Sequence, residues 1–168
     1  MTMIDIKKTD CNKKEDFYIF LDRSISALLR DESDWLANLC NTTALIWDMM
    51  ADINWVGFYL YKEGQLVLGP FQGKPACTRI NIGEGVCGTA ALIRESVLVQ
   101  DVHAFPGHIA CDSASNSELV VPLTNGDRII GVLDIDSPLF SRFDQDDRLG
   151  FEKIVETILK YLSIPEKY

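Results

Sequence analysis

The sequence lacks the features that would take a protein into a membrane or onto a nucleic acid. None of its apolar runs reaches the roughly 18 consecutive residues that a membrane-spanning helix needs. Lys and Arg together number 16 against 25 Asp and Glu, and the resulting net charge of -9 repels phosphate backbones and anionic lipid. No cluster of basic residues offsets that charge. We therefore expect no nucleic-acid partner and no membrane partner.

The sequence also lacks a leader segment and a paired set of cysteines. Its first residues, MTMIDIKKTDCNKKEDF, are polar and charged and contain no apolar stretch of the kind found in signal peptides. Its five cysteines are an odd number without a CxxC pair, which argues against a disulfide framework and against a four-ligand zinc site. We expect a cytoplasmic protein with reduced thiols, some of them redox-active, and with no bound metal.

Length and hydrophobic patterning predict one compact domain. The 168 residues, 47% of them hydrophobic, suffice for one sizeable core, so we expect a single domain over residues 1–168 with a polar tail at 1–13. Two helical patterns follow the tail, and Ser33 and Asp34 are the candidate N-caps of the second. The apolar positions are Phe17, Phe20, Ile25 and Leu28 in the first helix, and Leu36, Leu39, Cys40 and Ala44 in the second.

Alternating patterns beyond residue 54 predict a sheet. The first hairpin turns at 62–64, and the second, over 118–137, turns around Asn125-Gly126-Asp127. Between them the sequence predicts a short strand near 78–80, a helix opening at GEGVCG, a strand over SVLVQD and a long loop to Asn116; a final helix follows Ser141 or Asp144 as its cap. This order predicts an α+β fold. We expect a central, mainly antiparallel sheet with helices packed on one face and a loop-rich ligand pocket on the other.

The strand GVLDIDS places two carboxylates on one face of that sheet. Side chains alternate along a strand, so Asp134 and Asp136 share a face, and Glu118 at the head of the partner strand adds a third acid. Adjacent like charges favour a cation between them or a bound proton. An ammonium group or a hard metal such as magnesium fits, although no phosphate cradle accompanies the acids. The alternative is a strand end with solvated aspartates.

The strand NWVGFYLY places aromatic side chains beside a glycine. Trp55, Gly57, Tyr59 and Tyr61 share one face, and the apolar residues between them share the other. Core packing explains this pattern, because aromatic residues make up much of any core. Beside a carboxylate cluster, however, an aromatic wall with a glycine-sized gap would form a pocket for a small cationic ligand with an apolar tail.

Three of the thiols lie where chemistry is expected. Cys111 lies in a long loop among small polar residues, and such a loop of roughly 15 residues is usually functional. Cys77 lies in a shorter loop. Cys87 lies near the predicted start of a helix, where the helix dipole would favour a thiolate, but a buried structural cysteine explains that position equally well.

The remaining thiols and both histidines have ordinary explanations. Cys11 lies in the polar tail, and Cys40 fits an apolar helix stripe. His103 and His108 flank the loop that carries Cys111, but no fourth zinc ligand and no oxyanion donor is recognisable near them. We therefore expect the histidines to shape the loop.

Four stretches together resemble the free methionine-(R)-sulfoxide reductases, a family built on the GAF fold. They are NWVGFYLY, LGPFQGKPACTRINIGEGVCGTA, QDVHAFPGHIACDSASNSELVVPL and GVLDIDSP. The resemblance runs from Trp55 through the final helix and includes the three cysteines of the family in order. It implies reduction of free L-methionine (R)-S-oxide to methionine, with no bound cofactor. It also implies thioredoxin as the external reductant, supplied with electrons from NADPH through thioredoxin reductase, and it suggests a homodimer.

The same resemblance implies a role for each thiol. Cys111 is the nucleophile, which attacks the sulfoxide sulfur and becomes a sulfenic acid. Cys77 is the resolving thiol, with Cys87 as second candidate, and condensation gives an intramolecular disulfide that thioredoxin reduces.

The resemblance implies roles in substrate binding for the acids and aromatics. One of Glu118, Asp134 and Asp136 protonates the sulfoxide oxygen and the others pair with the substrate ammonium, without a distinction among the three. Trp55 and Tyr59 line the pocket around the S-methyl end. We further expect backbone amides of the GEGVCG segment to bind the substrate α-carboxylate.

A sensory module is the rival hypothesis. A GAF-type domain that binds a small ligand or reports redox state without turnover would share the architecture. The sequence contains no long signalling helix, and a pure binder has no use for three thiols near one pocket, so the enzyme is the favoured interpretation.

Overall fold

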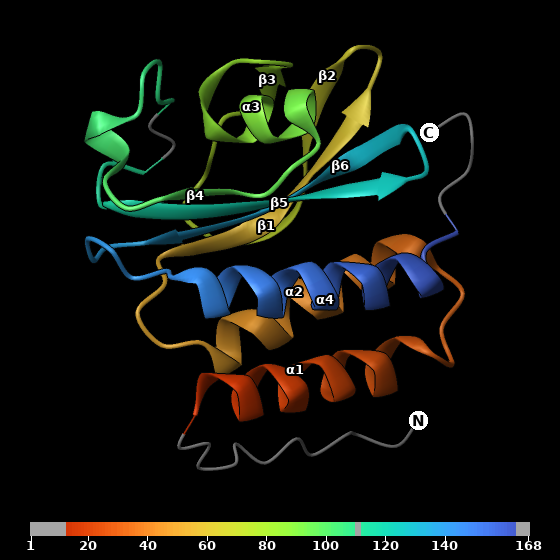
Figure 1. Cartoon of the computed structure of the whole chain (residues 1–168). Helices are drawn as coiled ribbons and strands as arrows, with labels where there is room; N and C mark the ends of the chain where they lie inside the picture. The colour runs from red at the N-terminus through yellow and green to blue at the C-terminus, as the bar shows by residue number, and fades with distance from the viewer. Residues whose placement is uncertain (1–12, 110–111, 164–168) are drawn as a thin grey trace.

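The computed structural model describes residues 13–109 and 112–163, which form one sheet with helices on both of its faces (Figure 1). The six strands lie in the order β3-β2-β1-β6-β5-β4, and every neighbouring pair is antiparallel. The predicted α+β architecture is therefore confirmed. The strands are β1 (Trp55–Lys62), β2 (Gln65–Gly73), β3 (Arg79–Asn81), β4 (Val97–Val99), β5 (Ser117–Asn125) and β6 (Arg128–Ser137).

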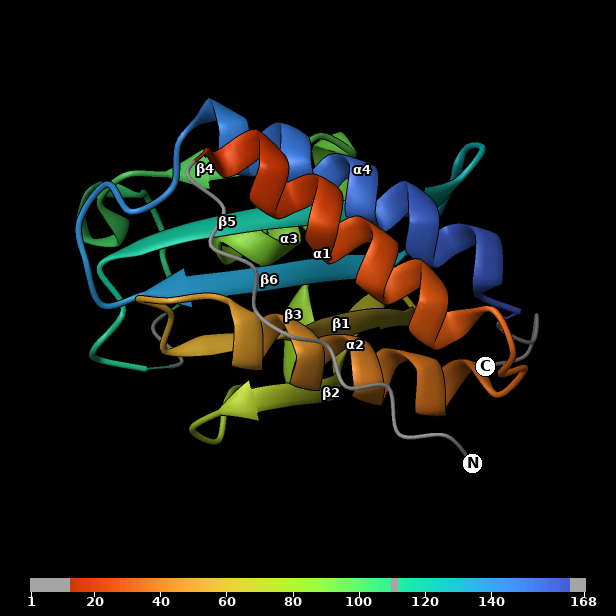
Figure 2. The same ribbon diagram turned by 90° about the horizontal axis from the view of Figure 1, so that it is seen from below.

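Three long helices cover one face of the sheet and a short helix lies on the other. Helices α2 (Trp35–Met49) and α4 (Gln145–Tyr161) pack on the sheet, and α1 (Lys14–Leu29) lies across them as an outer layer (Figures 1 and 2). Helix α3 (Gly85–Ile93) lies over the opposite face, together with the loops. The loop after β4 includes a 3-10 turn, η1 (Val102–Ala104). Among the described residues, no helix combines the length and apolar composition needed to cross a membrane.

Strand β1 separates two hydrophobic cores. Val56, Phe58 and Leu60 point into the large core beneath the sheet, where the three long helices pack. Trp55 and Tyr59 point the other way, into a smaller core that includes residues of α3. The period-two pattern of NWVGFYLY is therefore confirmed, and each face of the sheet has its own packing.

Both hairpins form as predicted, and aspartates cap two of the long helices. Glu63 and Gly64 form the first turn in left-handed conformations, with φ of 50° and 87°. Asp34 accepts a hydrogen bond from the Ala37 N–H at 2.8 Å and caps α2. Asp144, and not Ser141, caps α4 through a capping box with Asp147.

The predicted apolar stripe of α2 is wrong in three of its four positions. Leu39 is buried, but Leu36, Cys40 and Ala44 are exposed. The helix instead buries a face in which polar and apolar residues mix, so hydropathy alone misplaces it. Its buried members are Asn38, Leu39, Thr42, Thr43, Leu45, Ile46 and Met49. The Thr42 hydroxyl donates a hydrogen bond to the Asn38 carbonyl at 2.8 Å, so this polar side chain can lie on the buried face of the helix.

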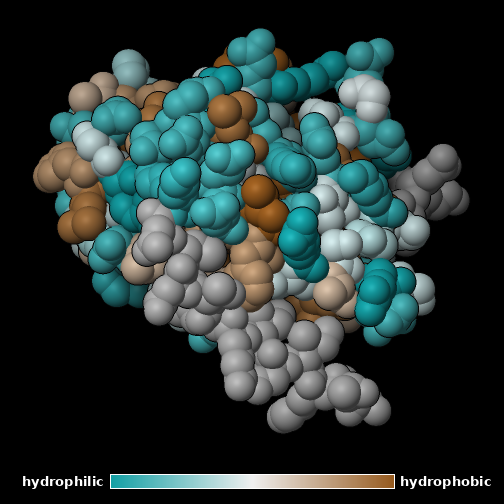
Figure 3. Space-filling model, turned by 60° about the horizontal axis from the view of Figure 1, so that its bottom comes forward, coloured by the Kyte–Doolittle hydropathy of each residue, from teal (hydrophilic) through white to brown (hydrophobic). Residues whose placement is uncertain are grey.

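The surface over the helical layer is mostly hydrophilic, with separate apolar residues (Figure 3). Exposed large apolar side chains on these helices include Ile19, Leu36 and Trp47. Scattered residues of this kind are normal on a soluble surface and do not by themselves define an interface. The homodimer implied by the family resemblance stays a prediction.

A buried carboxylate joins α1 to α4. The Asp147 side chain accepts the Tyr18 hydroxyl at 2.7 Å and the Lys14 ammonium at 2.6 Å. Burial and the charge of Asp147 raise the pKa of Tyr18, so its phenol stays protonated and remains a donor. A Cβ at Gly150 would lie 2.2 Å from the Tyr18 ring, which shows how closely the two helices approach.

We expect Tyr18→Phe to lower the free energy of unfolding by about 1.5–3 kcal/mol, the usual contribution of a hydrogen bond to a charged group. The ring packing stays and only the buried donor to Asp147 is lost. Urea unfolding followed by circular dichroism measures the change. The matched control is Tyr61→Phe on the exposed end of β1, which we expect to change stability by about 0.5 kcal/mol or less. Equal losses in both variants would contradict the role given to Asp147.

Candidate active site

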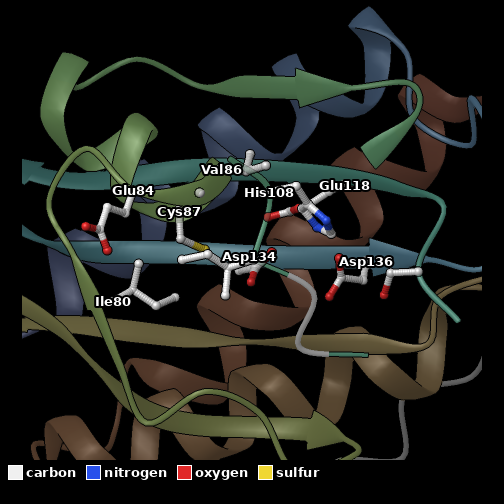
Figure 4. Close-up of a pocket in the computed structure, with 11 residues that line it drawn as sticks. Ile80, Glu84, Val86, Cys87, His108, Glu118, Asp134 and Asp136 are labelled. Carbon is white, nitrogen blue, oxygen red and sulfur yellow. The ribbon is translucent and has the colours of Figure 1, made fainter. Parts of the chain in front are cut away.

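A pocket opens on the face of the sheet opposite the three long helices, as the sequence predicts. It occupies about 340 Å³, counting the solvent at its mouth, and lies between the first turn of α3, strands β5 and β6 and the loop before β5. Figure 4 shows acidic, imidazole and thiol groups converging there. Its lining residues are Ile80, Glu84, Gly85, Val86, Cys87, His108, Ile109, Ser115, Glu118, Asp134 and Asp136.

The pairing of β5 with β6 brings three carboxylates together. Glu118 lies directly opposite Asp136, and Asp134 lies two residues further along the same face of β6. All three are only 5–6% exposed. The alternative of solvated aspartates at a strand end is therefore wrong. The alternate residues Leu133 and Ile135 lie in the core under the sheet and hold this face in register.

Burial governs the protonation of these acids. Removal from water raises the pKa of Glu118, Asp134 and Asp136 well above the ordinary range, and repulsion among the three raises it further. A carboxylate oxygen of Glu118 and one of Asp134 lie within 4.8 Å of each other. One oxygen of Asp134, Oδ1, is buried without a hydrogen-bond partner. The cluster can therefore donate a proton and can also accept a cation.

The environment of Cys87 overrides its place at the start of a helix. Cys87 is the third residue of α3 and is 4% exposed, and its sulfur lies within 4.8 Å of carboxylate oxygens of Glu118 and Asp134. Burial raises the pKa of Cys87 well above its ordinary value, and the nearby Asp134 and Glu118 raise it further. The prediction of an activated thiolate at this position is wrong, because desolvation and acidic neighbours outweigh the helix dipole. The alternative of a buried cysteine is confirmed.

The same groups form a possible metal-binding set. The sulfur of Cys87 and carboxylate oxygens of Glu118 and Asp134 lie within 4.8 Å of one another. Thiolate and carboxylate ligands suit zinc, but each must first lose a proton, and burial disfavours that here. The ligand atoms are therefore close enough for a metal ion, but their raised pKa values favour bound protons over a metal.

His108 is a pocket residue that the sequence alone does not identify. Its Nε2 lies 3.6 Å from Glu118 Oε2, and burial lowers its pKa. His103 instead lies 2.9 Å, through Nε2, from Asn116 Oδ1 and shapes the loop, as predicted. The only signal for His108 was its closeness in sequence to Cys111.

The glycine gap predicted beside the aromatics is filled. Trp55 stacks on Phe71 at 5.4 Å and on Tyr59 at 5.9 Å between ring centroids. A Cβ at Gly57 would lie 2.4 Å from the Phe71 Cβ, so this glycine allows ring packing rather than ligand entry. The prediction of a ligand space at Gly57 is therefore wrong.

Trp55 and Tyr59 support the loop that carries Cys77. They are 1% and 0% exposed and are not among the residues that line the pocket. The Trp55 indole N–H donates to the Lys74 carbonyl and the Tyr59 hydroxyl to the Cys77 carbonyl, both at 3.0 Å. Their contact with the S-methyl end of a substrate stays a prediction.

The three cysteines of interest differ in their placement. Cys87 lies in the pocket, whereas Cys77 is half-buried in the loop between β2 and β3 and packs against the same small core. Cys111 lies outside the described residues, so its predicted role as nucleophile is not tested by the fold. The next residue, Asp112, is buried and lies in the loop before β5.

Comparison with known proteins shows the family to which the chain is similar. The GAF domain family model matches residues 30–160. The free methionine-R-sulfoxide reductase of Escherichia coli (strain K12) is 52% identical over 150 residues, covering 89% of this chain and 91% of that protein. The protein of the same name from Saccharomyces cerevisiae is 44% identical over 155 residues, covering 88% of this chain and 86% of that protein. The X-ray structure of free methionine-R-sulfoxide reductase from Neisseria meningitidis in complex with its substrate superimposes with a TM-score of 0.87 at 44% identity, covering 90% of this chain and 92% of that one.

We expect Asp134→Asn to stabilise the protein at neutral pH by about 1–3 kcal/mol. A carboxyl group with a raised pKa binds its proton more tightly in the folded state, so stability is lost as pH rises above its unfolded pKa near 4. The isosteric amide removes that loss. Urea unfolding between pH 4 and 8 should show the difference from wild type growing with pH. Asp127→Asn, in the exposed turn of the second hairpin, is the control and should show no such growth. A constant difference across this range would contradict the raised pKa of Asp134.

Proposed function

The chain belongs to the GAF domain family and to its free methionine-R-sulfoxide reductases, and from this we propose that it reduces free L-methionine (R)-S-oxide to methionine by a thiol mechanism. The observation that carries the proposal is the buried cluster of Glu118, Asp134 and Asp136 in one small pocket. Buried acids need a cation or a proton. A free amino-acid sulfoxide meets both conditions, because its ammonium pairs with a carboxylate and its oxygen accepts a proton.

The acidic cluster would select the free amino acid over a protein residue. The α-ammonium of free methionine sulfoxide forms charge-assisted hydrogen bonds with carboxylates, whereas a peptide presents an amide at that position. The α-carboxylate would bind at the first turn of α3, where Gly85 and Val86 line the pocket and helical N–H groups have no partner within the helix. The two ends of the substrate would then be held by groups of opposite polarity.

The acids would also supply the proton that the reaction needs. A sulfoxide oxygen leaves poorly until it is protonated, and the raised pKa values of Glu118, Asp134 and Asp136 keep a proton available near neutral pH. Attack of the Cys111 sulfur on the substrate sulfur then forms a sulfur–sulfur bond as the protonated oxygen leaves as water. Water attacks the Cys111 sulfur and breaks that bond, so methionine is released and Cys111, oxidised by two electrons, is left as a sulfenic acid.

Cys77 is the better candidate for the resolving thiol. Its sulfur would attack the sulfenic sulfur of Cys111, forming a disulfide and releasing the oxygen as water. Cys87 stays the second candidate, but it is 4% exposed and its raised pKa disfavours the thiolate that attack requires. Cys77 is less buried and lies on a loop rather than in a helix.

Two thiols of thioredoxin would reduce the disulfide, with NADPH as the electron source through thioredoxin reductase. The scheme uses only thiols and carboxylic acids and assigns no step to a bound cofactor or metal. We place the protein in the cytoplasm, where this reducing system maintains free thiols, and we propose the homodimer that the family resemblance suggests.

We expect Cys111→Ser to lower turnover of the free R-sulfoxide by about 1,000-fold or more, because no other group replaces the nucleophile. The assay follows NADPH consumption with thioredoxin and thioredoxin reductase. Wild type should reduce the free R epimer and leave the S epimer and an R-sulfoxide peptide unreduced. Cys40→Ser, an exposed thiol on α2, is the matched control and should retain full activity. Full activity of Cys111→Ser would reject the nucleophile, and no turnover by wild type would favour a sensory module.

We expect N-acetyl-methionine (R)-sulfoxide to be reduced with kcat/KM lower by about 100-fold or more, since the ammonium that pairs with the acids is absent. The methyl ester of methionine (R)-sulfoxide keeps the ammonium and loses only the carboxylate charge. We expect a smaller loss for the ester in the same assay. Equal kcat/KM for the N-acetyl compound and the free amino acid would show that the acidic cluster does not bind the substrate ammonium.

A further inference from the structure

Outside the pocket, a second buried acid has partners that the proposed chemistry does not use. Asp112 is 6% exposed and accepts three hydrogen bonds: from Lys74 Nζ at 3.1 Å, from Asn54 Nδ2 at 3.3 Å and from the Ala114 N–H at 2.9 Å. These donors lower the pKa of Asp112, with the Ala114 amide contributing most and Lys74 next. Asp112 is therefore ionised where the neighbouring pocket acids tend to hold protons.

The partners of Asp112 belong to the segments that carry the reactive thiols. Lys74 opens the loop between β2 and β3, three residues before Cys77. Asp112 follows Cys111 directly in the chain. The Lys74–Asp112 ion pair thus joins the Cys77 loop to the residue next to Cys111.

Both sides of this ion pair are fixed to the sheet. On the Cys77 side, the Lys74 carbonyl accepts the Trp55 indole N–H at 3.0 Å. On the other side, Asn54 Nδ2 donates to Ser115 Oγ at 3.0 Å, and Ser115 lines the pocket beside Asp136. The ion pair is therefore the link between two anchored segments.

The energetics of the pair favour a positioning role. The side chain of Asp112 is 4% exposed but that of Lys74 is 66% exposed. Holding an exposed lysine side chain in one conformation costs entropy, so the pair itself adds little net stability. Its main effect is to restrict where the Cys77 loop lies relative to residue 112.

We propose that the Lys74–Asp112 ion pair is a positioning device that holds the Cys77 loop against the Cys111 segment and so speeds formation of their disulfide. This inference rests on the proposed function, in which Cys77 attacks the sulfenic acid of Cys111. In that step a sulfur–sulfur bond forms, the sulfur–oxygen bond breaks and the oxygen leaves as water. Lys74 and Asp112 act through placement and exchange no proton or electron with the substrate.

The pair should matter for the second step of the reaction and not for the first. Lys74 Nζ pairs with Asp112, and neither residue is among those that line the pocket, so methionine release in a single turnover should continue without Lys74. A slower second step leaves the sulfenic acid in place for longer. A sulfenic acid that persists can be trapped by dimedone or oxidised further to the sulfinic acid.

The test compares Lys74→Met with Lys74→Arg, which keeps the charge, and with Lys153→Met, an exposed lysine on α4. Each reduced protein is mixed with free methionine (R)-sulfoxide without reductant, and methionine, disulfide and dimedone adduct are quantified by mass spectrometry. We expect Lys74→Met to release one methionine per chain at the wild-type rate, to form disulfide about 10-fold more slowly and to gain dimedone adduct. Lys74→Arg and Lys153→Met should behave as wild type.

A wild-type rate of disulfide formation in Lys74→Met would overturn the proposal. Equal slowing of methionine release and disulfide formation would also overturn it, since that result indicates a role in substrate binding or folding. Thermal unfolding of each variant verifies that it is folded under the assay conditions.

A substrate-free arm separates this proposal from the proposed function. Diamide oxidises a pair of adjacent thiols to a disulfide without any sulfoxide. We expect the disulfide between Cys77 and Cys111 to form about 10-fold more slowly in Lys74→Met than in wild type. If wild type releases no methionine but this difference holds, the reductase function fails and the positioning role stands. If wild type releases methionine but diamide oxidises both proteins at one rate, only the positioning role fails.

Discussion

Burial of three carboxylic acids on one face of a hairpin is the constraint on which the rest of the structure depends. Isolated charges in such a place would destabilise the fold by several kcal/mol each, and the raised pKa values show that the molecule responds by retaining protons. The opposite face of β6 compensates through Leu133 and Ile135, which are fully buried under the sheet. A site that destabilises the protein when empty is stabilised when a cation enters, so the same constraint favours ligand binding.

The sheet divides the molecule into a supporting half and a reactive half. The three long helices cover the face opposite the acidic pocket, and the Asp147 network fixes α1 against α4 far from the acids. On the other face, α3 and the loops are held by hydrogen bonds from the sheet, such as that of the Tyr59 hydroxyl to the Cys77 carbonyl. The strands thus hold the acids rigidly, while the thiols lie on loops. Disulfide formation needs this arrangement, because the two loops that carry the thiols must be able to approach each other.

Local periodicity predicts part of the site, and long-range contacts decide the rest. Alternation along β6 is a property of any strand, so it places Asp134 and Asp136 on one face without knowledge of the fold. The raised pKa of the Cys87 thiol on α3 depends on acids from strands β5 and β6. The space at Gly57 on β1 is filled by Phe71 from the neighbouring strand β2. Hydropathy predicts the wrong buried face for α2 because the Thr42 hydroxyl donates to a backbone carbonyl, which allows this polar side chain to be buried. Lys74 and Asp112 lie 38 residues apart, a separation at which no local pattern predicts contact.

The contrast between Cys87 and Asp112 explains how one acidic region can hold both protonated and ionised groups. Cys87 faces acids and has no cation beside it in the described pocket, so its pKa rises. Asp112 is equally buried but receives an ammonium and an amide N–H, so its pKa falls. The charge of Asp112 in turn raises the pKa of Asp136. The charge of Asp112 thus favours protonation of an acid inside the pocket, while its ion pair with Lys74 joins the loop that precedes β5 to the loop that carries Cys77.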